Sequence, residues 1–248
     1  MKVLIYGWGS AEHLGINEVN DAMTNLVKKL GHEPVYLDDE VVCAEGLGAL
    51  GYGKQMREIA PVLVKLMENS GADVAVTPFA ASYYVWNYTL KDIPRKIPVI
   101  HVVQYLYREL SSKRPVFREY GKRVLIHDGC RLGRYSGVVK EPRAVLKMVP
   151  KLELVEFEHP DMDARGTKPW DIAPCPGSWL EITMNPLMPY VADNVLRRDV
   201  EPLNVDVLTT TCANGYHAFK AGKEFGHRDV EVKFIANLVD EVLVGVSE

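Results

Sequence analysis

Cysteine is scarce in this sequence, and it contains no long apolar run. The 248 residues include four cysteines, too few and too widely spaced for the disulfide framework of a small secreted protein. Each thiol must therefore be explained by burial, metal binding or catalysis. No stretch approaches the roughly 18 uninterrupted apolar residues that cross a membrane, and no basic flank or cleavage site precedes the first strand-like run. We therefore expect a cytoplasmic protein without a membrane span.

An excess of positive charge is also missing. The net charge is −4 and the isoelectric point is near 6.0, with lysines and arginines scattered among acids. A nucleic-acid backbone would have no basic face to bind, so nucleic acid is not expected as a partner. With 47% hydrophobic residues, the chain is long enough to bury one large core or two small ones.

The apolar pattern alternates short β-branched runs with longer stretches of helical period, which predicts an α/β fold with largely parallel sheets covered by helices. Strands are expected at residues 3–6, 35–37, 74–77 and 99–103, and helices at 19–30 and 56–67. The glycines between residues 46 and 53 predict a mobile loop. The run from Val230 to Val244 has helical period and predicts one closing helix.

The second part of the chain repeats the order of the first. Residues 123–127 (RVLIH) match residues 2–6 (KVLIY), and residues 204–216 match residues 72–83 after a shift of one residue. We therefore predict two related halves, residues 1–110 and 111–248, each a small, mostly parallel sheet flanked by helices. The boundary is expected in the polar segment between Ser111 and Tyr120.

Three of the cysteines fall in the second half. On the repeat, Cys130 follows the first strand, Cys175 lies in a middle loop and Cys212 follows the last matched strand. Loops at the carboxyl ends of parallel strands converge over a rigid sheet, so three distant cysteines could meet there. Thiolates are the usual ligands of iron–sulfur clusters. Taken singly, each free cysteine is more simply explained as a small apolar residue of the core.

The residues around these cysteines carry a family resemblance. The segment from His127 to Arg134 reads HDGCRLGR, Cys175 is followed by Pro176 and Gly177, and Cys212 begins CANGYH after 35 intervening residues from Pro176. This pattern resembles the cysteine-rich CCG domain proteins typified by the B subunit of heterodisulfide reductase. The resemblance covers nearly the whole chain, but the gap from Cys130 to Cys175 has grown to 44 residues.

The first half shows the same frame in eroded form. The family positions are occupied by Ser10, by Val42 and Cys43 after 31 residues, and by Phe79 and Ser82 after 35 more. In the family, each complete five-cysteine motif binds a noncubane [4Fe–4S] cluster. We therefore expect no cluster in this half, where Phe79 would fill the space with an apolar ring.

In the second half, Pro176 and Gly215 replace two of the five cysteines. The resemblance then implies a [4Fe–4S] or [3Fe–4S] cluster held by Cys130, Cys175 and Cys212, passing electrons to a disulfide or a sulfur carrier. Catalytic candidates are His127 and His217, as a fourth ligand or for proton delivery, and Arg131 for charge balance. Each histidine is more simply explained by a structural hydrogen bond, and the arginine by solvation or a salt bridge.

Two alternatives remain open from the sequence. Three cysteines with His127 or His217 would also form a structural zinc site of the Cys3His type. A scaffold subunit that has lost its clusters is the other alternative. The resemblance implies partners in a heterodisulfide-reductase-like complex, namely an iron–sulfur electron carrier and, as a further candidate, a flavoprotein. The physiological substrate cannot be derived from the sequence.

Overall fold

The computed structural model describes residues 1–37, 45–157 and 175–247. Its core is a pair of parallel four-stranded sheets with the orders β2-β1-β3-β4 and β7-β6-β8-β9. The strands of the first sheet are β1 (Lys2–Ile5), β2 (Glu33–Val35), β3 (Val74–Thr77) and β4 (Val99–His101). Those of the second are β6 (Arg123–His127), β7 (Glu153–Val155), β8 (Val207–Thr210) and β9 (Glu231–Phe234). The predicted α/β class and the parallel strand pairing are confirmed.

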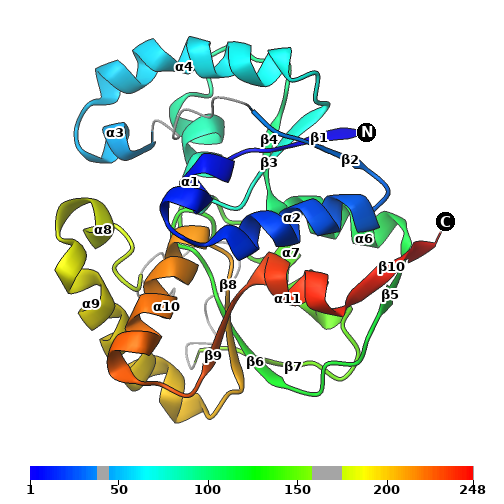
Figure 1. The fold of residues 1–248 in the computed structure, drawn as a ribbon, viewed down its shortest axis with the longest axis vertical. Coiled ribbons are helices and arrows are strands. Elements are labelled where there is room, and N and C mark those ends of the chain that lie inside the picture. Colours follow the sequence, from blue (N-terminus) through cyan, green and yellow to red (C-terminus); the bar gives the residue numbers. More distant parts are fainter. Residues whose placement is uncertain (38–44, 158–174, 248) are drawn as a thin grey trace.

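Helices flank both sheets (Figure 1). Around the first sheet they are α1 (Trp8–His13), α2 (Asn17–Lys29), α3 (Glu45–Ala49), α4 (Gly53–Asn69), α5 (Ala80–Tyr84) with the π-turn η1 (Val85–Thr89), and α6 (Val102–Ser112). Around the second they are α7 (Lys140–Lys147), α8 (Leu180–Thr183), η2 (Asn185–Leu187), α9 (Met188–Val195), η3 (Leu196–Val200), η4 (Glu201–Leu203), α10 (Ala213–Gly226) and α11 (Ile235–Val242). A short antiparallel pair joins β5 (Arg114–Phe117) to β10 (Leu243–Ser247).

Both faces of each sheet are buried, which explains why consecutive residues of its strands are apolar. In β1, Val3 and Ile5 face a core shared by both sheets, whereas Leu4 faces an outer core under α4. In β6, Val124 and Ile126 face the same shared core, and Leu125 faces an outer core of its own. The period-2 alternation thus assigns each strand residue to one of two layers.

The shared core lies between helices contributed by both sheets. Helix α2 packs against α11, and α6 packs against α7 (Figure 1). Lys29 of α2 forms a 2.8 Å ion pair with Asp240 of α11, and Asn237 donates to the backbone oxygen of Glu18 at 2.7 Å. Each of these pairs combines a helix of the first sheet with a helix of the second. One continuous apolar cluster therefore joins the two sheets.

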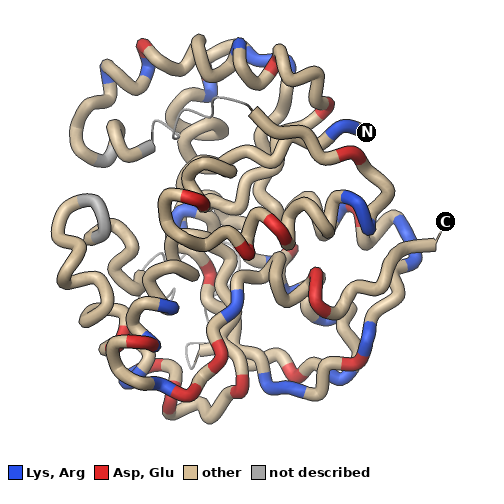
Figure 2. Tube along the Cα trace, viewed as in Figure 1, with Lys and Arg blue, Asp and Glu red and all other residues tan. Residues whose placement is uncertain are grey.

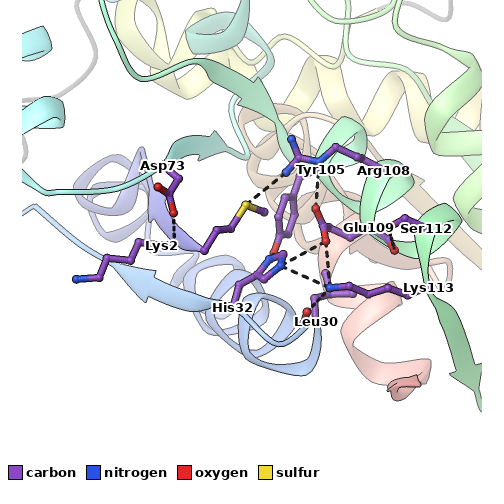
Figure 3. Close-up of polar contacts among 10 residues, drawn as sticks. Lys2, Leu30, His32, Asp73, Tyr105, Arg108, Glu109, Ser112 and Lys113 are labelled. Carbon is purple, nitrogen blue, oxygen red and sulfur yellow. Dashed lines mark hydrogen bonds and ion pairs between the residues drawn. The ribbon is translucent and has the colours of Figure 1, made fainter. Parts of the chain in front are cut away.

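A polar cluster fastens the turn after α2 to α6 (Figure 3). His32 Nδ1 lies 2.9 Å from the Tyr105 hydroxyl, and His32 Nε2 lies 3.4 Å from Glu109. Lys113 bonds Glu109 at 3.1 Å and donates to the backbone oxygen of Leu30. Burial lowers the pKa of His32, and the nearby Glu109 carboxylate opposes that shift.

Three sequence expectations are wrong. The strand expected over residues 99–103 ends at His101, because helix α6 begins at Val102. Instead of one helix over residues 230–244, the chain forms β9, α11 and β10, because residues 231–234 complete the edge of the second sheet beside β8. Instead of a loop over residues 46–53, Glu45–Ala49 is helical and α4 begins at Gly53. Leu47 packs against the outer core of the first sheet, so tertiary contact outweighs the low helix propensity of glycine there.

Charged residues of both signs are interleaved along the outer helices and turns of the two halves (Figure 2). Within the described ranges, no helix combines the length and apolar character needed to cross a bilayer.

Candidate functional site

The loops that follow β6 and β8 are tied together by threonine hydroxyls and backbone groups. Gly129 N donates to Thr211 Oγ1 at 2.9 Å, and Thr211 N donates to the carbonyl of His127 at 3.2 Å. Cys212 N donates to Thr210 Oγ1 at 3.2 Å. These bonds hold Cys130 and Cys212 at neighbouring carboxyl ends of the sheet. Neither threonine was among the site residues predicted from the sequence, although both stand directly before Cys212.

Gly129 is packed too closely to carry a side chain. A Cβ at this position would lie 2.7 Å from Cys212 Cβ and 3.3 Å from Ala80 Cβ. Cys212 is therefore next to Gly129, the residue that precedes Cys130. Ala80 of the first half also packs against Gly129.

Cys175 comes from the segment that leads into α8. Gly177 turns this segment with φ +83°, and Leu180 N donates to its carbonyl at 2.8 Å. The Cys175 sulfur lies 3.5 Å from Ser178 Oγ. Hydrogen bonds from the Cys130 thiol, the Ser178 hydroxyl and the amides of Ser178 and Gly177 lower the pKa of Cys175 to about 5, against the opposing effect of burial.

The three predicted cysteines therefore converge. The hydrogen bond that Cys130 donates to Cys175, burial, and the charges of Cys175 and Cys212 all raise the pKa of Cys130. Negative charge thus concentrates on Cys175, and all three thiols are half-buried and free of disulfides. Within the described residues, no three His, Cys, Asp or Glu side chains are grouped closely enough to hold a single metal ion.

The donor set can be tested against the group that the family binds. Pro176 and Gly215 stand where two further cysteines would be, and a Cβ on Gly215 would lie 4.0 Å from Pro176 Cγ and 3.6 Å from Cys212 Cβ. All five motif positions are thus neighbours, but only three carry sulfur. The set does not fit a five-thiolate cluster. It fits, in number and chemistry of donors, a cluster held by three thiolates, with amide groups of the Cys175 loop directed at sulfur.

The two histidine candidates lie in different surroundings. His127 is buried, and its ring packs edge-on against Phe219 at 5.0 Å and Phe157 at 6.1 Å between ring centroids. His217 is half-buried in the second turn of α10. The aromatic packing gives His127 a structural explanation, and ligand or proton-transfer functions for either histidine stay predictions.

Arg131 directly follows Cys130 and is surrounded by aromatic rings. Its guanidinium carbon lies 5.0 Å from the centroids of Tyr84 and Tyr135 and 6.0 Å from that of Trp179. Tyr84 belongs to the first half and Trp179 to the segment of Cys175. Arg131 therefore stands where the two halves and two cysteine loops meet.

An ion-pair network supports the Cys130 loop, and the sequence pattern did not predict it. Buried Asp128 accepts two hydrogen bonds from Arg143, at 3.0 and 2.7 Å, and Arg143 also binds Glu156 at 2.7 and 2.8 Å. These carboxylates raise the pKa of Arg143 above its usual value, against the opposing effect of burial. Asp128 stands inside the HDGCRLGR segment, whereas Arg143 and Glu156 lie outside the motif segments described above, so no motif spacing pairs these residues.

In the first half, an aromatic ring occupies the corresponding place. Phe79 is buried, and a Cβ on Gly7 would lie 2.6 Å from its ring. Gly7 has φ +109°, a conformation that favours glycine. Ser10 lies in α1 and Ser82 is buried in α5. Val42 and Cys43 lie outside the described residues.

The repeat extends to hydrogen bonds at the cysteine position. Phe79 N donates to Thr77 Oγ1 at 3.2 Å, as Cys212 N does to Thr210 Oγ1. Both residues have extended backbone angles and precede a helix. The two loops also touch, because Ala213 N donates to the carbonyl of Pro78 at 3.2 Å.

Fold and site together define an α/β protein of two related sheets, with cysteine loops gathered at the carboxyl ends of one of them. The family model described as the CCG cysteine-rich domain matches residues 9–81 and 124–165, one segment for each sheet. In these two segments the chain is similar to CCG-type proteins, with incomplete cysteine motifs.

The curated relatives include subunits of two reductases. The chain is 27% identical over 233 residues to the D subunit of the heterodisulfide reductase of Methanosarcina acetivorans, covering 90% of this chain and 54% of the relative. It is 26% identical to the B subunit of the fumarate reductase (CoM/CoB) of Methanothermobacter marburgensis, covering 90% of this chain and 43% of the relative. The chain thus spans about half the length of these relatives.

Among solved structures, the aspartate racemase of Picrophilus torridus matches with a TM-score of 0.46 and 10% identity, covering 94% of this chain and 88% of that one. Glutamate racemase of Francisella tularensis matches with a TM-score of 0.44 and 12% identity, covering 97% and 78% of the two chains. No activity is inferred from these likenesses.

Proposed function

We propose that this protein is a cytoplasmic subunit of a heterodisulfide-reductase-like complex that reduces a disulfide or a sulfur carrier. The redox site is an iron–sulfur cluster, [4Fe–4S] or [3Fe–4S], held by Cys130, Cys175 and Cys212. Electrons would arrive from a partner subunit that carries iron–sulfur clusters, with a flavoprotein as a further candidate. The relatives' names, which describe subunits of such reductases, support the complex.

The observation that carries the proposal is the meeting of three thiols from three separate segments. Cys130 lies close to both Cys175 and Cys212, and the ligands of one cluster must lie close together. A [4Fe–4S] cluster held by three thiolates would supply single electrons and one iron open to a sulfur ligand, whereas a [3Fe–4S] cluster would supply electrons only.

The surrounding residues have definable functions in this proposal. The amides of Gly177 and Ser178, with the Ser178 hydroxyl, stabilise negative charge on the Cys175 sulfur. Arg131 balances part of the negative charge of the thiolates. Phe79 closes the equivalent place in the first half, so a single redox centre remains.

The test is anaerobic purification with iron, sulfide and zinc analysis of the native chain and its cysteine variants. We expect iron and sulfide in the native protein and loss of both in Cys130→Ala, Cys175→Ala and Cys212→Ala. Cys43→Ala is the matched control, because this fourth cysteine stands in the eroded first half, and it should retain the cluster.

Other compositions would support the alternatives. Zinc without sulfide, lost in the same three variants, would establish a structural zinc site. A native protein free of metal, with a Cys212→Ala variant that folds and assembles normally, would establish a scaffold subunit.

A further inference from the structure

A cavity of about 280 Å³ is bordered by Arg131, the residue after Cys130, at the junction of the two halves. It is lined by Gly48, Gly53, Met56, Ala81, Tyr84, Val85 and Thr89 of the first half and by Arg131 and Trp179 of the second. Ala81 is the neighbour of Ala80, which borders Gly129. Arg131 directly follows Cys130. The cavity therefore adjoins the Cys130 loop on the side formed by residues of the first half.

Arg131 is the charged residue of this lining, and among the described residues it has no acidic partner. Other well-placed arginines do have one: Arg143 bonds Asp128 and Glu156, and Arg228 bonds Asp193 and Glu201. Within the described parts of the chain, the Arg131 guanidinium contacts aromatic faces instead of a carboxylate. Each such contact stabilises a cation by about 0.5–2 kcal/mol and occupies none of its hydrogen-bond donors.

The rings also restrict where the guanidinium can go. Tyr84 stacks on Tyr88 with centroids 5.1 Å apart, and the Tyr88 hydroxyl donates to the carbonyl of Ser136 across the two halves at 3.3 Å. The Tyr84 ring is therefore held by Tyr88, which is itself hydrogen-bonded to the second half. A side chain held in place before binding loses little conformational freedom when a ligand arrives.

The lining selects one class of ligand. A planar guanidinium pairs with a planar oxyanion through two parallel hydrogen bonds. Apart from Thr89, the remaining side chains of the lining are apolar or aromatic, so a ligand with a short aliphatic body is desolvated favourably there. A dianion such as phosphate would bring a second charge that finds no second cation among the lining residues, and burying an uncompensated charge is costly.

We propose that this cavity binds short-chain organic monoanions, carboxylates in particular, and that Arg131 recognises their charge. As an extension that rests on the proposed function, the sulfur substrate carries such an anionic group, which anchors it while its sulfur reaches the cysteine loops.

The experiment is calorimetric titration of the full-length protein with butanoate, its neutral isostere butanamide, and inorganic phosphate. We expect butanoate to bind at least about tenfold more tightly than the other two, equivalent to about 1.4 kcal/mol. Arg131→Gln should weaken butanoate binding by a similar factor. Ala81→Leu, which fills the cavity without changing its charge, should weaken it as well.

Arg118→Gln is the matched control, since Arg118 is an exposed arginine that follows β5 and does not line the cavity. It should bind butanoate as the native protein does. Near-ultraviolet circular dichroism of each variant establishes that it is folded. Equal affinity for butanoate and butanamide, tighter binding of phosphate, or unchanged binding in folded Arg131→Gln would overturn the proposal.

Failure of the proposed function would look different. If the protein contains no iron and reduces no disulfide, yet binds butanoate through Arg131, the carboxylate site stands and the redox assignment falls. If iron and sulfide are present but butanoate does not bind, the redox site stands and this inference is wrong.

Discussion

At the residue scale, Gly129 is where the two cysteine loops approach most tightly. A methyl group there would meet Cys212 Cβ at 2.7 Å and Ala80 Cβ at 3.3 Å. We expect Gly129→Ala to lower the free energy of unfolding by about 1–3 kcal/mol, as overpacked cores do, and to displace Cys212 from Cys130. Urea denaturation and iron content measure the two effects. Gly121→Ala is the control, because no atom of the described residues beyond its chain neighbours lies within 4 Å of the added Cβ. Equal stability of both variants would contradict the packing argument.

His101 makes the fold sensitive to acid. Its side chain is fully buried, which lowers its pKa to about 3, although a hydrogen bond to the Pro78 carbonyl opposes the shift. Below pH 6.5 the unfolded chain takes up a proton that the folded chain excludes, so stability falls as the pH drops from 6.5 towards 3. Between pH 6.5 and 5 this one group costs about 2 kcal/mol.

His101→Asn should remove that part of the pH dependence. Asparagine cannot titrate, and its side-chain oxygen can accept the Val103 amide hydrogen bond that His101 Nδ1 accepts at 3.3 Å. Denaturant unfolding at pH 6.5 and pH 5 measures the difference between native and variant proteins. His13→Asn, at an exposed site in α1, serves as the control. A native-like loss of stability on acidification of His101→Asn would show that His101 is not the group responsible.

At the scale of elements, Arg143 links α7 to β7 and to the loop after β6. The guanidinium bonds a nearly inaccessible carboxylate, Asp128, and a half-exposed one, Glu156. We expect Arg143→Gln to destabilise the protein by about 3–5 kcal/mol, because it leaves the Asp128 charge buried without a partner. The double variant Asp128→Asn with Arg143→Gln should recover part of the loss.

The matched comparison for this pair is Glu153→Gln, which removes the exposed ion pair with Arg123 and leaves the hydrogen bonds of Arg123 to the backbone oxygens of Leu203 and Asn204 in place. Such surface pairs contribute about 0–1 kcal/mol. A double-mutant cycle in urea separates the pair energy from other effects. If Arg143→Gln cost no more than Glu153→Gln, the network would be dispensable for the Cys130 loop.

At the scale of the whole molecule, the core between α2, α6, α7 and α11 is assembled from both sheets. Residues 1–110 alone would expose the apolar face that α11 and α7 cover. We expect this fragment to remain loosely packed, with weak near-ultraviolet circular dichroism and strong binding of a hydrophobic dye. Co-expression with residues 111–248 should restore a folded complex. Cooperative unfolding of the isolated fragment would instead establish it as an independent domain.

The sequence by itself determined the strand cores, the α/β class and the cysteine positions at strand ends, because these depend on local periodicity and on the repeat. Residues 74–77 and 123–127 form the predicted strands. Phe79 is buried against Gly7, and its filling of a former cluster space stays a prediction. The division into residues 1–110 and 111–248, and the functions of individual site residues, stay predictions.

Only the tertiary structure decided what depends on contacts between distant segments. Residues 231–234 became an edge strand because β8 offered hydrogen bonds that a helix could not use. Arg143 found Asp128, and Arg131 entered an aromatic enclosure contributed by both halves, because separate chain segments fold to the same place. Periodicity reports which face of an element is buried, and it carries no information about the residue that will lie opposite.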